Sequence, residues 1–197
     1  MSEARKRVGV LISGRGSNMA ALIEAARAAD YPAEIALVIS NRPDAAGLET
    51  AAKQGIATRV VDHKQFESRN DFEAELYEVL ARARIDIVCL AGFMRVLTPS
   101  FVERWRGRML NIHPSLLPAL KGLNTHARAL ATGVKMHGCT VHFVVPELDS
   151  GPIILQEPVP VLEGDSEEKL AARVLAAEHR IYPAALRLVA EGKAGRG

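Results

Sequence analysis

The sequence predicts an α/β fold of the Rossmann-like type, in which an open, mostly parallel sheet carries helices on both faces. Short apolar segments rich in β-branched residues alternate with longer segments in which apolar residues recur at helical spacing. Parallel neighbours in a sheet need long crossover connections, so this alternation favours parallel pairing. In the first half of the chain the predicted strands are residues 7–12, 34–39, 57–61 and 85–91.

The predicted helices of the first half cover residues 19–29 and 72–83. In the second of them, one face collects Phe72, Leu76, Val79, Leu80 and Ala83. After residue 107 the pattern loosens. A segment rich in Pro, Gly and His, residues 113–126, precedes a short helical stretch, and loops of that composition are usually functional. The predicted strands of this half are 108–112, 139–145 and 153–161.

Length and composition predict a single domain over residues 1–197, with no sign of a linker or a repeat. The 25 basic and 23 acidic side chains leave a formal charge of +2, which gives little reason to expect a nucleic acid or an anionic membrane as partner. The apolar run from Val8 to Ile12 is too short for a signal-peptide core or a membrane span, so we expect a cytoplasmic protein. Cys89 and Cys139 lie in strand-like apolar runs, which favours reduced core thiols over a disulfide or a metal site.

A glycine-rich loop, residues 13–18, connects the first predicted strand to the first predicted helix. Glycines let the backbone approach a ligand, Ser17 or Asn18 can cap the helix, and exposed N–H groups at a helix N-terminus favour an anion such as phosphate. Met19 replaces the third glycine of a dinucleotide fingerprint, and no acidic residue ends the second strand, so a nicotinamide cofactor is disfavoured. A tight turn without a ligand is the alternative.

Polar side chains are expected at the carboxyl end of the strand 108–112. Asn111 and His113 share one side of that strand, and Pro114 ends it directly afterwards, which exposes His113. Ligands of open α/β sheets collect at such ends, where an amide could stabilise an oxyanion and an imidazole could move a proton. A capping Asn and a structural His remain the alternative. Asp149 lies in a Gly- and Pro-rich turn, and taken alone it indicates a residue that closes an Asx turn rather than a catalytic one.

The last predicted helix carries a carboxylate on its apolar side. Asp165 and Ser166 can cap this helix, and Glu178 lies four residues after Val174 and three before Ile181. A buried carboxylate without a partner is costly. The sequence therefore predicts either a structural ion pair or a ligand contact at Glu178.

Seven motifs resemble the phosphoribosylglycinamide formyltransferase family in order and spacing, and together they cover essentially the whole chain. The Asn-x-His-Pro-Ser motif is shared with the wider folate-dependent formyltransferase superfamily, whereas the Gly-Ser-Asn loop narrows the resemblance to the purine enzyme. The motifs are LISGRGSN (11–18), LAGFMRVL (90–97), LNIHPSLLP (110–118), THARAL (125–130), HGCTVHFV (137–144), ELDSGPII (147–154) and EHRIYP (178–183).

The resemblance implies the formyltransferase fold, a direct transfer of a formyl group from 10-formyltetrahydrofolate to the amine of glycinamide ribonucleotide, and no metal. It implies that Asn111 holds the tetrahedral oxyanion, that a protonated His113 stabilises it, and that Asp149 keeps His113 charged. Further residues are implied for binding the two substrates: Gly16, Ser17, Asn18 and Glu178 for the ribonucleotide, and Arg69, Met94, Arg95, Val96 and Leu97 for the folate, with the backbone around Val144 to Asp149 facing the pterin.

The chain departs from the family pattern at residues 119–124, a loop that closes over substrate in the family. The main alternative is a formyltetrahydrofolate hydrolase, which carries an additional N-terminal module, whereas the first predicted strand here begins at about residue 7. Methionyl-tRNA formyltransferases carry an additional C-terminal RNA-binding domain. A non-catalytic nucleotide-binding module is a third alternative. We expect small-molecule substrates and either a monomer or a homodimer.

Overall fold

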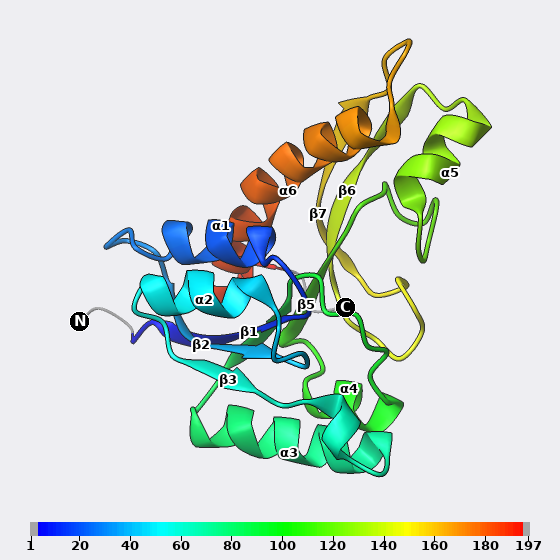
Figure 1. The fold of residues 1–197 in the computed structure, drawn as a ribbon. Helices are drawn as coiled ribbons and strands as arrows, with labels where there is room; N and C mark the ends of the chain where they lie inside the picture. The colour runs from blue at the N-terminus through cyan, green and yellow to red at the C-terminus, as the bar shows by residue number, and fades with distance from the viewer. Residues whose placement is uncertain (1–3, 195–197) are drawn as a thin grey trace.

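The computed structural model describes residues 4–194 and contains a seven-stranded sheet of order β3-β2-β1-β4-β5-β6-β7 (Figure 1). The first five strands run parallel, and β6 and β7 are added antiparallel. The predicted mostly parallel, open sheet is therefore confirmed. The strands are β1 (Lys6–Ile12), β2 (Ala33–Ser40), β3 (Thr58–Val60), β4 (Ile87–Leu90), β5 (Met109–His113), β6 (Met136–Phe143) and β7 (Ile153–Pro160).

Helices cover both faces of the sheet, as predicted (Figure 1). The first face carries α1, α2 and α6, and the opposite face carries α3 and α4, so each face buries its own apolar cluster. The helices are α1 (Ser17–Ala25), α2 (Ala46–Lys53), α3 (Arg69–Arg82), α4 (Pro99–Arg104), α5 (Thr125–Thr132) and α6 (Glu167–Ala190), with a short 3-10 helix, η1 (His63–Gln65).

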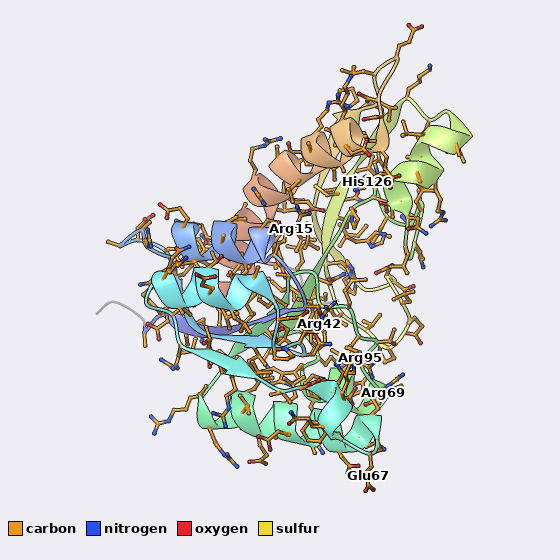
Figure 2. The ribbon with its side chains drawn as sticks, in the orientation of Figure 1. Arg15, Arg42, Glu67, Arg69, Arg95 and His126 are labelled. Carbon is orange, nitrogen blue, oxygen red and sulfur yellow. The ribbon has the colours of Figure 1, made fainter. Side chains whose placement is uncertain are left out.

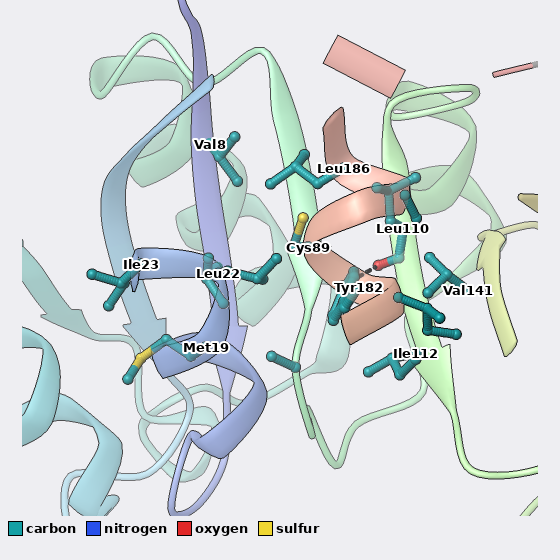
Figure 3. Packing of buried hydrophobic residues seen from close by; sticks show 14 of the residues in the cluster. Val8, Met19, Leu22, Ile23, Cys89, Leu110, Ile112, Val141, Tyr182 and Leu186 are labelled. Atoms are coloured by element: carbon teal, nitrogen blue, oxygen red, sulfur yellow. Dashed lines mark hydrogen bonds between the residues drawn. The ribbon is translucent and has the colours of Figure 1, made fainter. Parts of the chain in front are cut away.

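The long helix α6 connects the parallel and antiparallel parts of the sheet by packing against α1, β6 and β7. Its N-cap is Ser166, whose hydroxyl accepts a hydrogen bond from the Lys169 N–H. Asp165, the other predicted cap, instead forms an ion pair with Arg173. Deeper in the core, the Tyr182 hydroxyl donates to the Leu90 and Leu110 carbonyls, which attaches the helix to two adjacent strands. Figure 3 shows the contact between Tyr182 and Leu110.

Several predicted boundaries were wrong. Helix α1 ends at Ala25 rather than residue 29, and its N-cap is Gly16 in the left-handed conformation, so neither Ser17 nor Asn18 caps it. Strand β3 has three exposed residues instead of five, because it is an edge strand with a neighbour on one side alone. Helices α2 and α4 were not predicted, since eight and six residues are too few for a clear apolar period.

The strand order reverses between β1 and β4. From β1 the chain moves outward through β2 and β3, and it then returns to place β4 and β5 on the other side of β1. The segments that follow β1 and β4 therefore diverge above the sheet, and in open α/β sheets such a switch point is the usual ligand site. Residues 13–16 follow β1, and residues 91–98 follow β4.

Both cysteines are buried and free, which confirms the predicted core thiols. Burial raises the pKa of each thiol to about 12. None of the helices within residues 4–194 combines the length and the apolarity that crossing a membrane requires.

Candidate active site

A cavity of about 1010 Å³ opens at the carboxyl ends of β1, β4 and β5, next to the switch point. Its walls come from segments that are far apart in sequence: the glycine loop, the segment after β4, the end of β5, the loop before α5, the β6–β7 connection and one side of α6. Its size suits one or two small organic molecules. The predicted site residues that line it are Asn18, Met94, Arg95, Val96, Leu97, Asn111, His113, Asp149 and Glu178.

The imidazole of His113 and the carboxylate of Asp149 meet inside this cavity. His113 Nδ1 lies 3.5 Å from Asp149 Oδ2, and each side chain is 7% exposed. The prediction that His113 is exposed at the strand end is therefore wrong, because its side chain is buried from bulk solvent. The ring does line the cavity. Burial strengthens the attraction between a cationic ring and this carboxylate, because little water screens them.

The backbone of Asp149 explains how its carboxylate reaches the cavity. Its φ is 49°, in the left-handed region, which Asp and Asn tolerate better than most residues. Close by, Gly151 packs so tightly that a methyl group at its Cα would lie 1.7 Å from the Phe143 carbonyl oxygen. The β6–β7 connection can therefore fold back over the end of β6 with glycine at this position. Asp149 does more than close a turn, since its Oδ2 also accepts the Gly122 N–H at 2.8 Å.

Asn111 and His142 face each other across the antiparallel pair β5–β6, in register. Burial lowers the pKa of His142, so its ring is neutral. His142 Nδ1 lies 2.9 Å from the Phe143 carbonyl, which makes that nitrogen the donor and leaves Nε2 as an acceptor. Asn111 Nδ2 lies 3.3 Å from Nε2 and donates to it. This contact orients the Asn111 amide, which lines the cavity and whose second N–H has no acceptor among residues 4–194.

The loop 119–124, where the chain departs from the family pattern, touches both members of the His–Asp pair. The Leu120 carbonyl lies 3.0 Å from His113 Nε2, and the Gly122 N–H bonds Asp149. Leu120 and Asn124 both have positive φ, which non-glycine residues rarely adopt. In this conformation the loop is therefore hydrogen-bonded to Nε2 of His113, the ring nitrogen that does not face Asp149.

The glycine loop contributes Asn18 and Arg15 to the cavity, whereas Gly16 and Ser17 are not part of its wall. Asn18 Nδ2 donates to Glu178 Oε2 at 2.7 Å, and burial raises the pKa of this carboxyl group. Asn18 Oδ1 is buried and has no hydrogen-bond partner within residues 4–194. A buried acceptor without a donor is costly, so a ligand with an N–H or O–H group would be favoured here.

The predicted folate residues divide into two groups. Met94, Arg95, Val96 and Leu97 line the cavity, and the side chains of Met94 and Val96 are exposed toward it. Arg69, the first residue of α3, is exposed and is not part of the wall (Figure 2).

Six polar residues of the cavity were not predicted as site residues: Arg15, Asn124, Thr125, His126, His142 and Glu168. Figure 2 shows Arg15 at the start of α1 and His126 on α5. The sequence could have indicated Arg15, because it places a cationic side chain inside the loop that we predicted to bind an anion. His142 gave no signal, because it alternates with apolar residues inside a strand. Within the described part of the chain, no group of three or more His, Cys, Asp or Glu side chains is placed to hold a metal ion.

Comparisons with known proteins agree with this geometry. A family model described as formyl transferase matches residues 6–186. Phosphoribosylglycinamide formyltransferase of Escherichia coli is 49% identical over 184 residues, which cover 93% of this chain and 87% of that protein. The crystal structure of phosphoribosylglycinamide formyltransferase from Brucella melitensis has a TM-score of 0.92 at 52% identity, covering 98% of this chain and 100% of that one.

A longer relative is also similar. The trifunctional purine biosynthetic protein adenosine-3 of Homo sapiens is 55% identical over 188 residues, which cover 95% of this chain. The chain spans only 19% of the length of that protein. The match over residues 6–186, with relatives of this identity and coverage, shows that the chain belongs to the formyl transferase family, in its phosphoribosylglycinamide formyltransferase branch.

Proposed function

We propose that this protein transfers the formyl group of 10-formyltetrahydrofolate to the amine of glycinamide ribonucleotide, a step of purine biosynthesis. The observation that carries the proposal is that one cavity collects an oriented amide, an imidazole paired with a carboxylate, and a glycine loop at a helix N-terminus. These are the groups that acyl-level transfer to an anionic acceptor requires. The names of the similar proteins support the same activity.

Each group has a defined role in the proposed reaction. The amine attacks the formyl carbon and the carbonyl oxygen becomes an oxyanion, to which the free N–H of Asn111 donates. A cationic His113 stabilises the same negative charge, and Asp149 Oδ2, 3.5 Å from the ring, stabilises the cation. As the intermediate collapses, the bond between the formyl carbon and the folate nitrogen breaks. The proton released by the attacking amine is passed through Asp149 to that nitrogen, which departs as a neutral amine.

His113 must change one contact before it can act. In the present conformation the Leu120 carbonyl lies 3.0 Å from Nε2, while Nδ1 faces Asp149. We propose that loop 119–124 shifts when substrates bind and frees Nε2 for the reacting oxygen. The loop is suited to this role, because its contacts to the catalytic pair are two backbone groups, one on each partner.

The two substrates are assigned to opposite ends of the cavity. We place the phosphate of the ribonucleotide at the glycine loop, with Gly16, Ser17 and Asn18 as contacts and with Arg15 as an additional cation. Glu178 and the unpaired Asn18 Oδ1 then face polar groups of the same molecule. The folate occupies the apolar end formed by residues 94–97 and 144–148. Arg69 lies outside the wall and can meet only a part of the folate that extends out of the cavity, such as its carboxylate end.

The test is a turnover assay with both substrates. Purified protein is expected to consume glycinamide ribonucleotide and 10-formyltetrahydrofolate in equal amounts, followed by absorbance of the folate product and by mass of the formylated ribonucleotide. A control without the ribonucleotide separates the reaction from hydrolysis. Formate release at a comparable rate in that control would favour a hydrolase.

Three further features stay predictions. We propose that residues 1–197 form one domain, which is supported by a single sheet that contains all seven strands of residues 4–194. A monomer or homodimer and a cytoplasmic location are the expectations from composition and relatedness. Small molecules are the proposed partners, and neither a nucleic acid nor a membrane is required by the proposed reaction.

A further inference from the structure

The segment that forms the apolar end of the cavity has almost no structure of its own. Residues 92–97 lie between β4 and α4 and belong to neither a helix nor a strand. Just before the segment, the Ala91 N–H bonds the Leu11 carbonyl, and just after it the Thr98 N–H bonds Glu73. Among the residues that the structure describes, the Met94 N–H makes the one backbone hydrogen bond within this stretch.

The acceptor of that hydrogen bond is the hydroxyl of Ser13. Ser13 Oγ lies 2.8 Å from the Met94 nitrogen and 2.5 Å from Asn41 Oδ1, and Ser13 is 5% exposed. A hydroxyl has one proton, which goes to the Asn41 oxygen, so its lone pair is directed at the Met94 N–H. Asn41 follows β2 and is itself held, because its side-chain amide contacts the ring of His63 at 3.1 Å.

These contacts join the carboxyl ends of three neighbouring strands. Ser13 follows β1, Asn41 follows β2, and Met94 follows β4. Ser13 is also the first residue of the glycine loop, residues 13–18. A single buried hydroxyl therefore connects the loop assigned to the phosphate with the segment assigned to the folate, at the point where the strand order reverses.

We propose that Ser13 is a positioning residue for the formyl donor, holding residues 92–97 at a fixed distance from the glycine loop through the Met94 backbone. The inference rests on the proposed function for the identity of the donor. The contact itself is independent of it. Alanine at position 13 leaves the Met94 N–H without its acceptor and Asn41 Oδ1 without its donor, so the segment loses its internal anchor.

Ser40 provides a matched control. Like Ser13, Ser40 is a buried serine at the carboxyl end of a strand, and its hydroxyl makes two hydrogen bonds. Unlike those of Ser13, both bonds go to one nearby residue, because the Ser40 hydroxyl contacts only the N–H and the carbonyl of Arg42. Ser40 does not line the cavity. A general cost of removing a buried hydroxyl would therefore be the same in Ser13→Ala and Ser40→Ala.

The experiment compares both variants with the unmodified chain in the two-substrate assay. Ser13→Ala is expected to raise the KM for 10-formyltetrahydrofolate about three- to tenfold, the effect of losing one hydrogen bond, with kcat changed less than about threefold. The KM for glycinamide ribonucleotide is expected to change less than that for the folate. Ser40→Ala is expected to leave both KM values unchanged.

A second measurement does not depend on activity. Amide hydrogen exchange followed by NMR is expected to show a protected Met94 amide in the unmodified chain and in Ser40→Ala, and at least about tenfold faster exchange in Ser13→Ala. Equal KM values in the two variants, or a Met94 amide that stays protected in Ser13→Ala, would overturn the inference. An unmodified chain that transfers no formyl group would instead overturn the proposed function, and with it the identity of the donor.

Discussion

Asp149 combines a left-handed backbone with a carboxylate that is 7% exposed and aimed at an imidazole. Asn tolerates the same φ and keeps an oxygen for the Gly122 N–H, so Asp149→Asn removes the charge and little else. We expect kcat/KM to fall at least about a hundredfold with little change in melting temperature, because the lost interaction acts on the transition state.

Asp165→Asn is the matched control for this change. Asp165 is also a shielded carboxylate that accepts a backbone N–H and pairs with a cation, Arg173, but it lies outside the cavity. Its substitution is expected to lower the melting temperature and to leave kcat/KM unchanged. Activity retained in Asp149→Asn, together with a large loss of stability, would assign Asp149 a structural role.

Arg15 places a cation at the positive end of the α1 dipole, which is unfavourable unless an anion is also bound there. Within residues 4–194 its guanidinium forms no ion pair, and it lines the cavity beside Asn18. Arg15→Gln is expected to raise the KM for glycinamide ribonucleotide about tenfold and to change the KM for the folate much less.

The control is Arg42→Gln, because Arg42 is an exposed cation that pairs with Asp44 and does not line the cavity. At low and at high salt, both KM values of Arg42→Gln should equal those of the unmodified chain measured at the same salt concentration. Raising the salt concentration is expected to weaken ribonucleotide binding more in the unmodified chain than in Arg15→Gln, since salt screens the lost charge. Equal salt effects in the two proteins would contradict the phosphate assignment of Arg15.

The proposed catalytic residues differ in how clearly the sequence indicates them. Asn111 and His113 stand two apart before a proline, so strand geometry alone places both side chains at one strand end. Asp149 reads as a turn residue until its contact with His113 is seen, because 36 positions of chain separate the two. His142 could not be predicted, since its role depends on which residue lies opposite it in β5.

At the level of elements, periodicity predicted the buried strands and the long helices and failed for short or edge elements. Helix α6 and strands β1 and β2 have enough apolar residues to show a period. Strand β3 has three residues and α4 has six, so their positions are decided by the neighbours they pack against. The pairing of β7 with β6 likewise depends on a connection that packs closely at Gly151.

That glycine gives a prediction for the β6–β7 connection. A methyl group at Gly151 would overlap the Phe143 carbonyl, so Gly151→Ala must displace the connection that carries Asp149. We expect a loss of about 2–4 kcal/mol in the free energy of unfolding, measured in urea, together with a fall in kcat/KM.

Gly55→Ala compares this overlap with an alanine that is strained by its backbone conformation alone, because Gly55 has a positive φ and Gly151 does not. Gly55 has a φ of 77° and nothing within 4 Å of its would-be methyl group, and it lies outside the cavity. Its substitution should cost about 1 kcal/mol and leave kcat/KM unchanged. A Gly151→Ala variant no less stable than Gly55→Ala would show that the connection can move without resistance.

For the molecule as a whole, buried histidines are expected to make the fold sensitive to mild acid. His137 is 2% exposed, and burial lowers its pKa to about 4, with the charges of His126 and His113 adding to the effect. Burial also lowers the pKa of His126, whose Nδ1 lies 3.1 Å from His137 Nε2, and that of His142. The raised pKa of Glu178 acts in the opposite direction, because the folded chain then binds a proton more readily than the unfolded chain.

The folded and unfolded chains bind a proton at position 137 in different pH ranges. Below about pH 6.5 the unfolded chain protonates position 137, while the folded chain keeps that ring neutral down to about pH 4. The contribution of His137 is therefore complete above pH 6.5 and is lost as the pH falls toward 4, by about 3 kcal/mol in total. His137→Gln keeps a polar group near His126 but cannot titrate, so urea unfolding at pH 7.5 and pH 5 should show a smaller loss of stability in the variant. If both proteins lost stability equally over this interval, His137 would not be the group that couples folding to acid, and the contact between α5 and β6 would have to tolerate a charged ring.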